Sequence, residues 1–523
     1  MELQLNHQNA LVVLRQALTD NNDARNAAET VLNRWAKEPG YCKVLMDLLA
    51  NPGIETNLRW LSILNLKNGV NRHWRRRVDG ITDQEKAHLR PAMLSLMEEQ
   101  HDPIAIQIAV LIAKVARFDY PQSWPELFSS LAHSIQSPND VTRRRAMLSL
   151  YHVINELASR CFSVTRQQFH SVAPDLFSFV LNIWHQYRTT LCAGPTVQAV
   201  QHASLSLKVL RRLAQYGFAR VDQSESLYTF FSSVMETIQQ MLQAHAAVGD
   251  AAVQQAIQKL ILKCFRVVID VHTLHPLSFK NYLLPFLQLA FSQVMTTKPA
   301  SATDLHQQIA VKSMIFLRNV ISCSAYTATA PAAGTMPLLR KDASTLPGPH
   351  ELRHIVDGFL VAASLCELCQ HLVANYLRLT MSELHEWNTD PASFLHEDEI
   401  DSVDRPRHCA ELLYSTMLQF HRETLGPTVV QILRQVSANP PADMDQLLVK
   451  DAVYLAVGLA AYDLYDYLSF PEWFSTTLQA DLHVRPRRML WFRFRFRWNR
   501  AARLRACCHP YERHCRSATL GSC

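Results

Sequence analysis

Apolar residues recur at helical spacing in one segment after another along this chain of 523 residues. The clearest ladder places aliphatic side chains at i, i+4, i+7, i+8 and i+11, on one face of an α-helix: Ile104, Ile108, Leu111, Ile112 and Val115. Similar spacing returns at residues 147–154 and 449–460. No segment before residue 482 shows sustained strand alternation with hairpin turns, so the pattern predicts an all-α fold.

Short polar or proline-containing breaks separate the predicted helices. The break Asp20–Asp23 lies between helices predicted over 10–19 and 24–37, and its side chains can cap a helix N-terminus. Pro39-Gly40 ends the second helix, and the next are predicted over 41–50 and 58–70. Glycine is scarce, 13 of 523 residues against about 7% in typical proteins, so few positions accept a positive φ.

Helices joined by short breaks over most of the chain form either bundles or a solenoid. A helix-pair period of about 40–47 residues characterises HEAT-type arrays, so residues 1–482 have room for roughly ten to twelve pairs. One pair cannot bury its apolar face alone and stacks on its neighbours. We therefore predict an α-solenoid of stacked HEAT-type helical repeats, with loops near residues 325–350 and 381–404.

The formal net charge of +6 is concentrated in one terminal segment. Residues 483–523 hold eleven Arg and one acidic residue, so residues 1–482 carry a formal charge of −4. Because the excess is local, we expect no direct nucleic-acid binding by the chain. No apolar run reaches the roughly 18–20 residues that span a bilayer, and the N-terminus lacks a secretory signal. We expect a soluble intracellular chain without membrane insertion, whose twelve Cys are reduced.

Motifs for catalysis or metal binding are weak. The chain has no glycine loop of the nucleotide-binding kinds and no Gly-x-Ser-x-Gly elbow. Cys366 and Cys369 have C-x-x-C spacing, but a tetrahedral zinc site needs four ligands, so we interpret them as two buried thiols on one helix. The Cys and His residues of 507–515 are poorly spaced for chelation. We predict that the chain is not an enzyme and uses neither a cofactor nor a metal.

Three clusters of charged residues are candidate contact surfaces, and two of them allow two interpretations each. Residues 72–77 surround Trp74 with Arg and His, which suits base stacking or, as we prefer, a helix-end surface that meets an acidic protein patch. The three Arg of 143–145 open a predicted helix and form a solvated face or, alternatively, a partner contact. Residues 381–404 hold eight acids and no Lys or Arg, and we predict a helix that continues as an acidic loop.

Several motifs taken together resemble a known family. The first is Glu29-x-x-Leu32-x-x-Trp35 followed by Pro39-Gly40-Tyr41. The others are Asn57-Leu58-Arg59-Trp60-Leu61, Leu66-Lys67-Asn68-Gly69, Ala116-Arg117-Phe118-Asp119-Tyr120-Pro121 and Trp124-Pro125-Glu126-Leu127. In these spacings the chain resembles the N-terminal domain of the importin-β (karyopherin-β) superfamily, and the resemblance extends over roughly residues 10–482.

The resemblance implies a nuclear transport receptor, an importin, that binds cargo protein and Ran-GTP and contacts Phe-Gly-repeat nucleoporins. Such a receptor shuttles between nucleus and cytoplasm, and we expect a monomer whose cargo has basic surfaces. The family's Ran-binding motif positions carry over to Arg59, Lys67, Asn68 and Trp74. Acidic contact candidates, with a solvated loop as the alternative, are Glu397, Asp398, Glu399, Asp401 and Asp404. Residues expected to hold the fold instead are Trp35, Trp60, Pro121, Trp124 and Pro125.

Pattern and resemblance together divide the chain into four parts. We predict first helices at 1–30, an importin N-terminal (Ran-binding) domain at 29–130, further HEAT repeats at 131–482 and an Arg/Cys-rich tail at 483–523. Family members are roughly twice as long, so we expect missing C-terminal repeats and an out-of-frame or alternatively spliced tail, with a basic membrane-surface segment as the alternative. An exportin of the same superfamily and a static HEAT-repeat scaffold remain alternative functions.

Overall fold

The computed structural model describes residues 3–76, 78–158, 163–327, 348–390, 405–438 and 441–479. Every regular element within these ranges is helical and none is a strand, which confirms the predicted all-α fold. The chain divides into two compact units, Met1–Lys263 and Cys264–Cys523. The predicted acidic contact residues and the predicted tail lie outside the described residues, as does most of the predicted loop near 325–350.

The first helices of unit 1 begin and end within three residues of the predicted bounds. They are α1 (His7–Ala17), α2 (Asn22–Trp35), α3 (Tyr41–Ala50) and α4 (Thr56–His73). The Asn21 side chain caps α2, because its Oδ1 accepts hydrogen bonds from the backbone N–H of Asp23 at 2.9 Å and of Ala24 at 3.3 Å. Gly40 adopts a φ of 90°, in the left-handed region that glycine tolerates, and immediately precedes α3.

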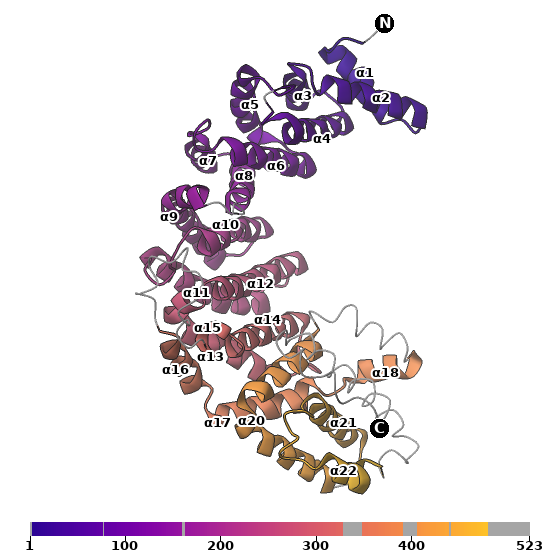
Figure 1. The fold of residues 1–523 in the computed structure, drawn as a ribbon, viewed down its shortest axis with the longest axis vertical. Coiled ribbons are helices and arrows are strands. Elements are labelled where there is room, and N and C mark those ends of the chain that lie inside the picture. Colours follow the sequence, from indigo (N-terminus) through magenta and orange to yellow (C-terminus); the bar gives the residue numbers. More distant parts are fainter. Residues whose placement is uncertain are drawn as a thin grey trace, which may run out of the picture. The chain divides into compact units, whose positions relative to one another are not determined.

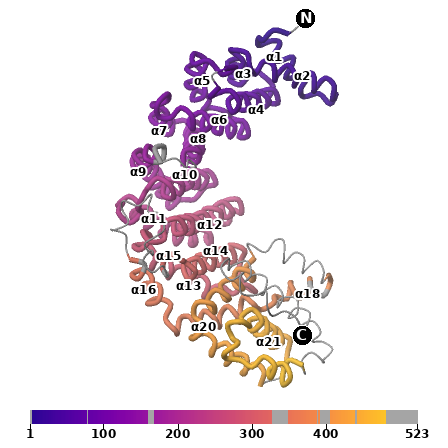
Figure 2. The backbone as a smooth tube through the Cα atoms, in the orientation of Figure 1, coloured from indigo at the N-terminus to yellow at the C-terminus, as the bar shows by residue number. Residues whose placement is uncertain are grey.

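The helices of unit 1 form pairs, in each of which an odd-numbered first helix is followed by an even-numbered second helix, and the remaining helices continue this order. They are α5 (Asp83–Ser95), α6 (Asp102–Asp119), α7 (Leu127–Ile135), α8 (Asp140–Ala158), α9 (Ser163–Ala193), α10 (Val197–Tyr216), α11 (Glu225–Ala247) and α12 (Ala251–Leu274), within which the unit boundary falls. The second helices α4, α6, α8 and α10 pack one on the next, as Figure 1 shows. The first helices α3 and α5 also pack together, so the unit has two rows of helices (Figure 2).

Side-chain contacts between successive helix pairs reveal the length of the repeat. Arg59 pairs with Glu99 and Lys67 with Gln107, each 40 residues away, while Trp74 and Asp119 are separated by 45. Farther along, Arg117 reaches Glu156 across 39 residues and Trp184 reaches Ser233 across 49. These separations agree with the period of about 40–47 residues of HEAT-type arrays.

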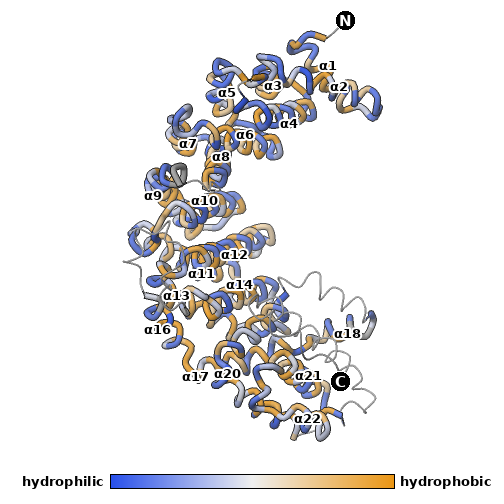
Figure 3. Tube along the Cα trace, viewed as in Figure 1, coloured by the Kyte–Doolittle hydropathy of each residue, from blue (hydrophilic) through white to orange (hydrophobic). Residues whose placement is uncertain are grey.

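The core lies between the two rows of helices. All five residues of the predicted ladder on α6, from Ile104 to Val115, are at most 2% exposed. Of the five residues expected to hold the fold, Trp35 and Trp124 are completely buried, Trp60 and Pro121 are half-buried and Pro125 is exposed. Figure 3 shows that hydrophobic and hydrophilic residues alternate along each of these helices, as they do in amphipathic helices with one buried face.

Unit 2 contains the end of α12 and a further series of helices. Its elements are η2 (Leu277–Phe279), α13 (Lys280–Thr296), α14 (Asp304–Ile321), α15 (Ser324–Thr327), α16 (Pro349–Phe359), α17 (Ala362–His371), η4 (Leu372–Tyr376), α18 (Met381–Thr389), α20 (Pro406–Ala438), α21 (Met444–Leu459), α22 (Phe470–Trp473) and η6 (Phe474–Leu478). Helix α14 packs on α13 and α20, and α20 packs on α17 and α21. The backbone of α20 is kinked at His421.

The helical start predicted for residues 381–404 is present as α18, where Thr380 and Glu383 form a capping box. Among the described residues no single helix is both long and apolar enough to cross a membrane, although the bent pair His350–Phe359 and Ala362–Tyr376 passes by length and composition together.

His272, at the end of α12, makes the stability of unit 2 depend on pH. The ring is 1% exposed, its Nε2 lies 2.8 Å from the Tyr326 hydroxyl, and the aromatic rings of Phe279 and Phe316 pack against it. Burial lowers the pKa of His272 from 6.5 to about 4. The unfolded chain therefore binds a proton between pH 6.5 and 4 that the folded chain does not, and stability falls as pH falls through this window.

We expect His272→Phe to flatten this part of the pH dependence. Between pH 7 and pH 4 the wild-type chain should lose about 3 kcal/mol more stability than the variant, at 1.36 kcal/mol per pKa unit. Urea unfolding at a series of pH values, followed by circular dichroism, measures the difference. Because the other histidines are shared by both proteins, equal slopes would show that His272 contributes nothing.

Candidate functional site

Arg59, the first of the predicted Ran-binding residues, lies in the interior of unit 1. Its side chain is 9% exposed and pairs with the carboxylate of Glu99, which is 4% exposed. The Arg59 Nε also donates a hydrogen bond to the Leu49 carbonyl at 2.9 Å. The guanidinium thereby joins α3, α4 and the turn before α6, and both of its described contacts are internal.

Lys67 and Asn68 lie one and a half to two turns before the end of α4 and are more accessible. The Lys67 Nζ donates a hydrogen bond to Gln107 Oε1 at 2.7 Å, from α4 to α6. Asn68 is exposed. Of the four predicted Ran-binding residues, these two have side chains that a partner can reach.

Trp74, at the C-terminal end of α4, is 2% exposed. Its indole Nε1 donates a hydrogen bond to Asp119 Oδ1 at 2.9 Å, and the same carboxylate forms an ion pair with Arg90 at 2.8 Å. The Lys86 ammonium lies 5.9 Å from the centroid of the Trp74 ring. Trp74 therefore connects α4, α5 and α6, and its buried ring is not a platform for base stacking.

The three arginines at the start of α8 differ from one another. Arg145 is 6% exposed, and its guanidinium donates hydrogen bonds to the carbonyls of Glu99 at 2.9 Å and Gln100 at 3.1 Å. The interpretation as a solvated face is therefore wrong for Arg145, because the side chain closes the preceding turn. Arg144 is half-buried, and its Nη2 lies 3.4 Å from Asp102 Oδ2.

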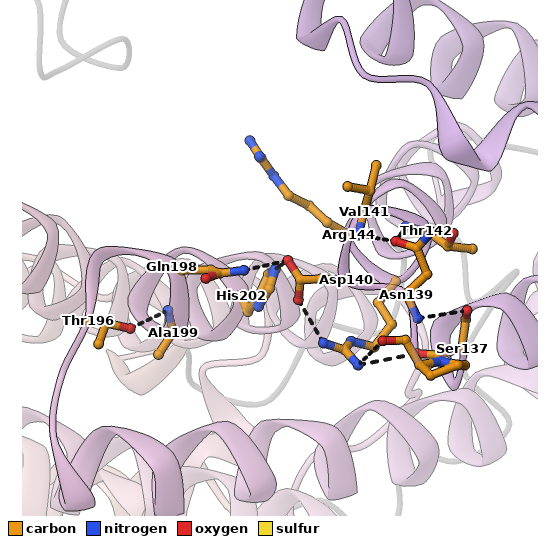
Figure 4. Close-up of polar contacts among 12 residues, drawn as sticks. Ser137, Asn139, Asp140, Val141, Thr142, Arg144, Thr196, Gln198, Ala199 and His202 are labelled. Carbon is orange, nitrogen blue, oxygen red and sulfur yellow. Dashed lines mark hydrogen bonds and ion pairs between the residues drawn. The ribbon is translucent and has the colours of Figure 1, made fainter.

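A polar network around Asp140 joins the first turns of α8 and α10 (Figure 4), and Arg143 belongs to it. It pairs with Asp140 at 2.7 Å, and the same carboxylate accepts a hydrogen bond from Gln198 at 2.6 Å and lies 3.5 Å from His202 Nε2. The pKa of Asp140 is lowered from its ordinary value. Burial by itself would raise this pKa, but the hydrogen bonds from Arg143 and Gln198 to the carboxylate outweigh the effect of burial. In Figure 4 the Arg144 side chain extends away from this network.

The side chain of Arg144 contributes to a groove with a volume of about 400 Å³ on the second helices of unit 1. Residues from α6, α8, α10 and α12 line it, and they include five basic side chains: Arg144, Arg145, Lys208, Lys259 and Lys263. No sequence motif predicted this groove. The sequence features that could have indicated the groove are the helical spacing of its basic residues within each repeat and the period that relates one repeat to the next.

The C-x-x-C pair lies on α17, and both thiols are free. Cys369 is buried, and burial raises its pKa to about 12, which makes it a poor nucleophile and metal ligand. Cys366 is half-buried, so the expectation of two buried thiols is wrong for this residue, and its Sγ lies 3.2 Å from the Thr428 hydroxyl. Within the described ranges no group of three or more potential metal ligands comes together.

The paired helices with stacked second helices define an α-solenoid built from HEAT-type repeats. Residues 28–99 match the model of the importin-beta N-terminal domain. The chain is 32% identical to importin-11 of Mus musculus over 500 residues, which are 93% of this chain and 50% of that protein. In these comparisons the chain is similar to members of the importin-β (karyopherin-β) superfamily, and it spans about half the length of the curated relatives it matches.

Solved structures of transport receptors have a similar fold. Lph2, described as a bidirectional nuclear transport receptor of S. cerevisiae, superposes with a TM-score of 0.71 at 23% identity, covering 90% of this chain and 47% of Lph2. The structure of Kap121p bound to RanGTP superposes with a TM-score of 0.56 at 14% identity, covering 90% of this chain and 38% of Kap121p. Both likenesses concern the HEAT-repeat solenoid itself.

Proposed function

We propose that the chain acts as a nuclear transport receptor that binds cargo proteins and Ran-GTP. The observation that supports this most strongly is the importin-beta N-terminal domain at 28–99, within a chain similar to importin-11 over 93% of its length. Kap121p, which has a similar fold, was solved bound to RanGTP. The receptor contacts Phe-Gly-repeat nucleoporins and shuttles between nucleus and cytoplasm as a monomer.

The repeat architecture supplies a physical basis for cargo exchange. Each helix pair packs mainly on its neighbours, so small shifts spread over many interfaces change the curvature of an array. Ran and cargo that favour different curvatures are coupled, and the coupling is reciprocal in free energy. We expect the acidic residues Glu397–Asp404 to contact basic cargo or Ran in this exchange.

Import is the proposed direction, because the similar protein with 32% identity is an importin. Export is the second candidate, supported by the similarity to the bidirectional receptor Lph2. In an importin Ran-GTP releases cargo, whereas in an exportin it strengthens cargo binding. A static HEAT-repeat scaffold would not distinguish the nucleotide states of Ran.

A pulldown with the full chain tests these functions. The immobilised chain is incubated with nuclear lysate and either GTP-loaded or GDP-loaded Ran. We expect retention of Ran-GTP in preference to Ran-GDP, together with loss of the cargo proteins retained without Ran. Gain of proteins with Ran-GTP would indicate export, and equal behaviour in both nucleotide states would refute the transport proposal.

Lys67→Glu is expected to weaken Ran-GTP binding by roughly tenfold, since reversing one charge in a contact typically changes affinity by this order. The side chain is accessible on α4, and the substitution leaves the Arg59–Glu99 and Trp74–Asp119 contacts in place. Titration of labelled Ran-GTP measures the change. The matched control is Lys43→Glu, an exposed residue of α3, and equal affinities for the two variants would contradict the assignment of Lys67.

A further inference from the structure

The groove on unit 1 is lined by both basic and aliphatic side chains. It lies on four second helices, α6, α8, α10 and α12, with a volume of about 400 Å³. Its lining residues are Asp102, Ile106, Arg144, Arg145, Leu148, Val197, Val200, Gln201, Ser204, Leu205, Lys208, Ala252, Gln255, Ala256, Lys259 and Lys263. All of them belong to unit 1, so the groove depends on this unit alone.

The charge of the groove is not balanced from within. Among these described lining residues Asp102 is the one acid, against five basic side chains. Asp102 is already engaged, because its Oδ1 lies 2.6 Å from the guanidinium of the buried Arg145. Lys208 is half-buried and Lys259 exposed, and no carboxylate among the lining residues lies on α10 or α12 with them. A site with this excess of cations attracts an anionic ligand.

Aliphatic side chains line the groove together with the cations. Ile106 is 42% exposed, and Leu148 and Leu205 are half-buried. None of the described lining side chains is aromatic, so bases of a nucleic acid would find no ring to stack on. A segment in which carboxylates alternate with aliphatic side chains matches both kinds of lining residue, the cations by charge and the aliphatic side chains by burial of apolar area.

We propose that this groove binds an extended acidic segment of a protein partner, with an aliphatic side chain beside the exposed Ile106 and carboxylates beside Lys208 and Lys259. The exposed amides of Gln201 and Gln255 face the same groove and can hydrogen-bond a peptide backbone. The inference rests on the proposed function in that it names the chemistry of one partner of the receptor.

This partner differs from the basic cargo expected for the receptor. A formal charge of −4 describes the sum over many surfaces. Around Lys208 and Lys259 the second helices carry a local positive charge. A receptor with both an acidic segment at 397–404 and a basic groove can hold partners of either sign at different places.

Fluorescence anisotropy with the full chain tests the proposal. Four helices spaced about 8–10 Å apart are spanned by about ten extended residues. The probe is therefore a labelled peptide of about ten residues in which Glu and Leu alternate. Two comparison probes are the same peptide with Gln in place of Glu and a single-stranded oligonucleotide of similar length. We expect the Glu peptide alone to bind, with an affinity that falls as salt is added.

Charge-reversal variants locate the binding. Lys208→Glu combined with Lys259→Glu should weaken peptide binding by at least tenfold, and Ile106→Ser by severalfold. The matched control is Lys37→Glu combined with Lys43→Glu, which makes the same change of charge at two exposed lysines outside the groove. Lys259→Glu alone, at an exposed position, repeats the test with little risk to folding, and circular dichroism verifies the helix content of every variant.

Four results would overturn the proposal: no binding of the Glu peptide, equal binding of the Gln peptide, equal loss in the control variant, or tighter binding of the oligonucleotide at the same lysines. Loss of Ran-GTP binding in the groove variant would also overturn it, because the groove would then be part of the Ran contact. A chain that binds the peptide at these lysines but retains neither form of Ran would support this proposal and refute the transport function.

Discussion

Replacing Arg59 by Met is expected to lower the free energy of unfolding by about 3–5 kcal/mol, the usual cost of leaving one member of a buried ion pair unpaired. The Glu99 carboxylate would remain 4% exposed without its guanidinium partner, and the Leu49 carbonyl would lose a donor. Urea unfolding of the full chain, followed by circular dichroism, measures the loss.

The exposed pair Arg15–Glu55 provides the matched control. These side chains are 62% and 67% exposed, with 3.1 Å between the charged atoms, so Arg15→Met should change stability by no more than about 1 kcal/mol. The double variant Arg59→Met with Glu99→Met should recover much of the stability lost by Arg59→Met, because no charge is then buried alone. A loss for Arg59→Met as small as that of the control would contradict the structural role of Arg59.

Trp74→Ala is expected to destabilise unit 1 by about 3–5 kcal/mol, because it removes a large buried ring and leaves a cavity. The substitution also removes the indole donor from Asp119, which retains Arg90 as a partner. Thermal unfolding of the full chain measures the effect.

Trp74→Phe separates packing from a direct contact with Ran. It keeps most of the ring volume and loses the 2.9 Å hydrogen bond to Asp119, so we expect a cost of about 1–3 kcal/mol with Ran-GTP binding retained at temperatures where the variant is folded. A Trp74→Phe variant with wild-type stability and no Ran binding would instead identify Trp74 as a direct contact.

Much of the helical framework could be predicted from local sequence. The helix at Tyr41–Ala50 was predicted with the bounds that the structure shows, and the Asp20–Asp23 break contains the residue that caps α2. The apolar ladder from Ile104 to Val115 is buried throughout. These features follow from helical periodicity and capping, which act over a few residues.

The predicted site could be recovered only in part. The sequence motif groups Arg59, Lys67, Asn68 and Trp74 within one helix and its end, but it does not distinguish buried from accessible members. That distinction depends on Glu99, Gln107 and Asp119, which lie 40 to 45 residues away in the next helix pair. Spacing within one helix carries no information about which side chains of the next repeat will meet it.

The sequence by itself determined the helical class and predicted the stacking of repeats, because the period of apolar residues and the breaks between helices are local properties. Its motifs carried the resemblance to the importin-β superfamily. Only the tertiary structure decided that Arg145 closes a turn while Lys208 and Lys259 share a basic groove. Residues from α8, α10 and α12 approach one another because successive second helices stack, which places side chains about one repeat apart beside each other. The net charge of the chain sums over all its surfaces, whereas the positive charges of Lys208 and Lys259 lie together in this groove.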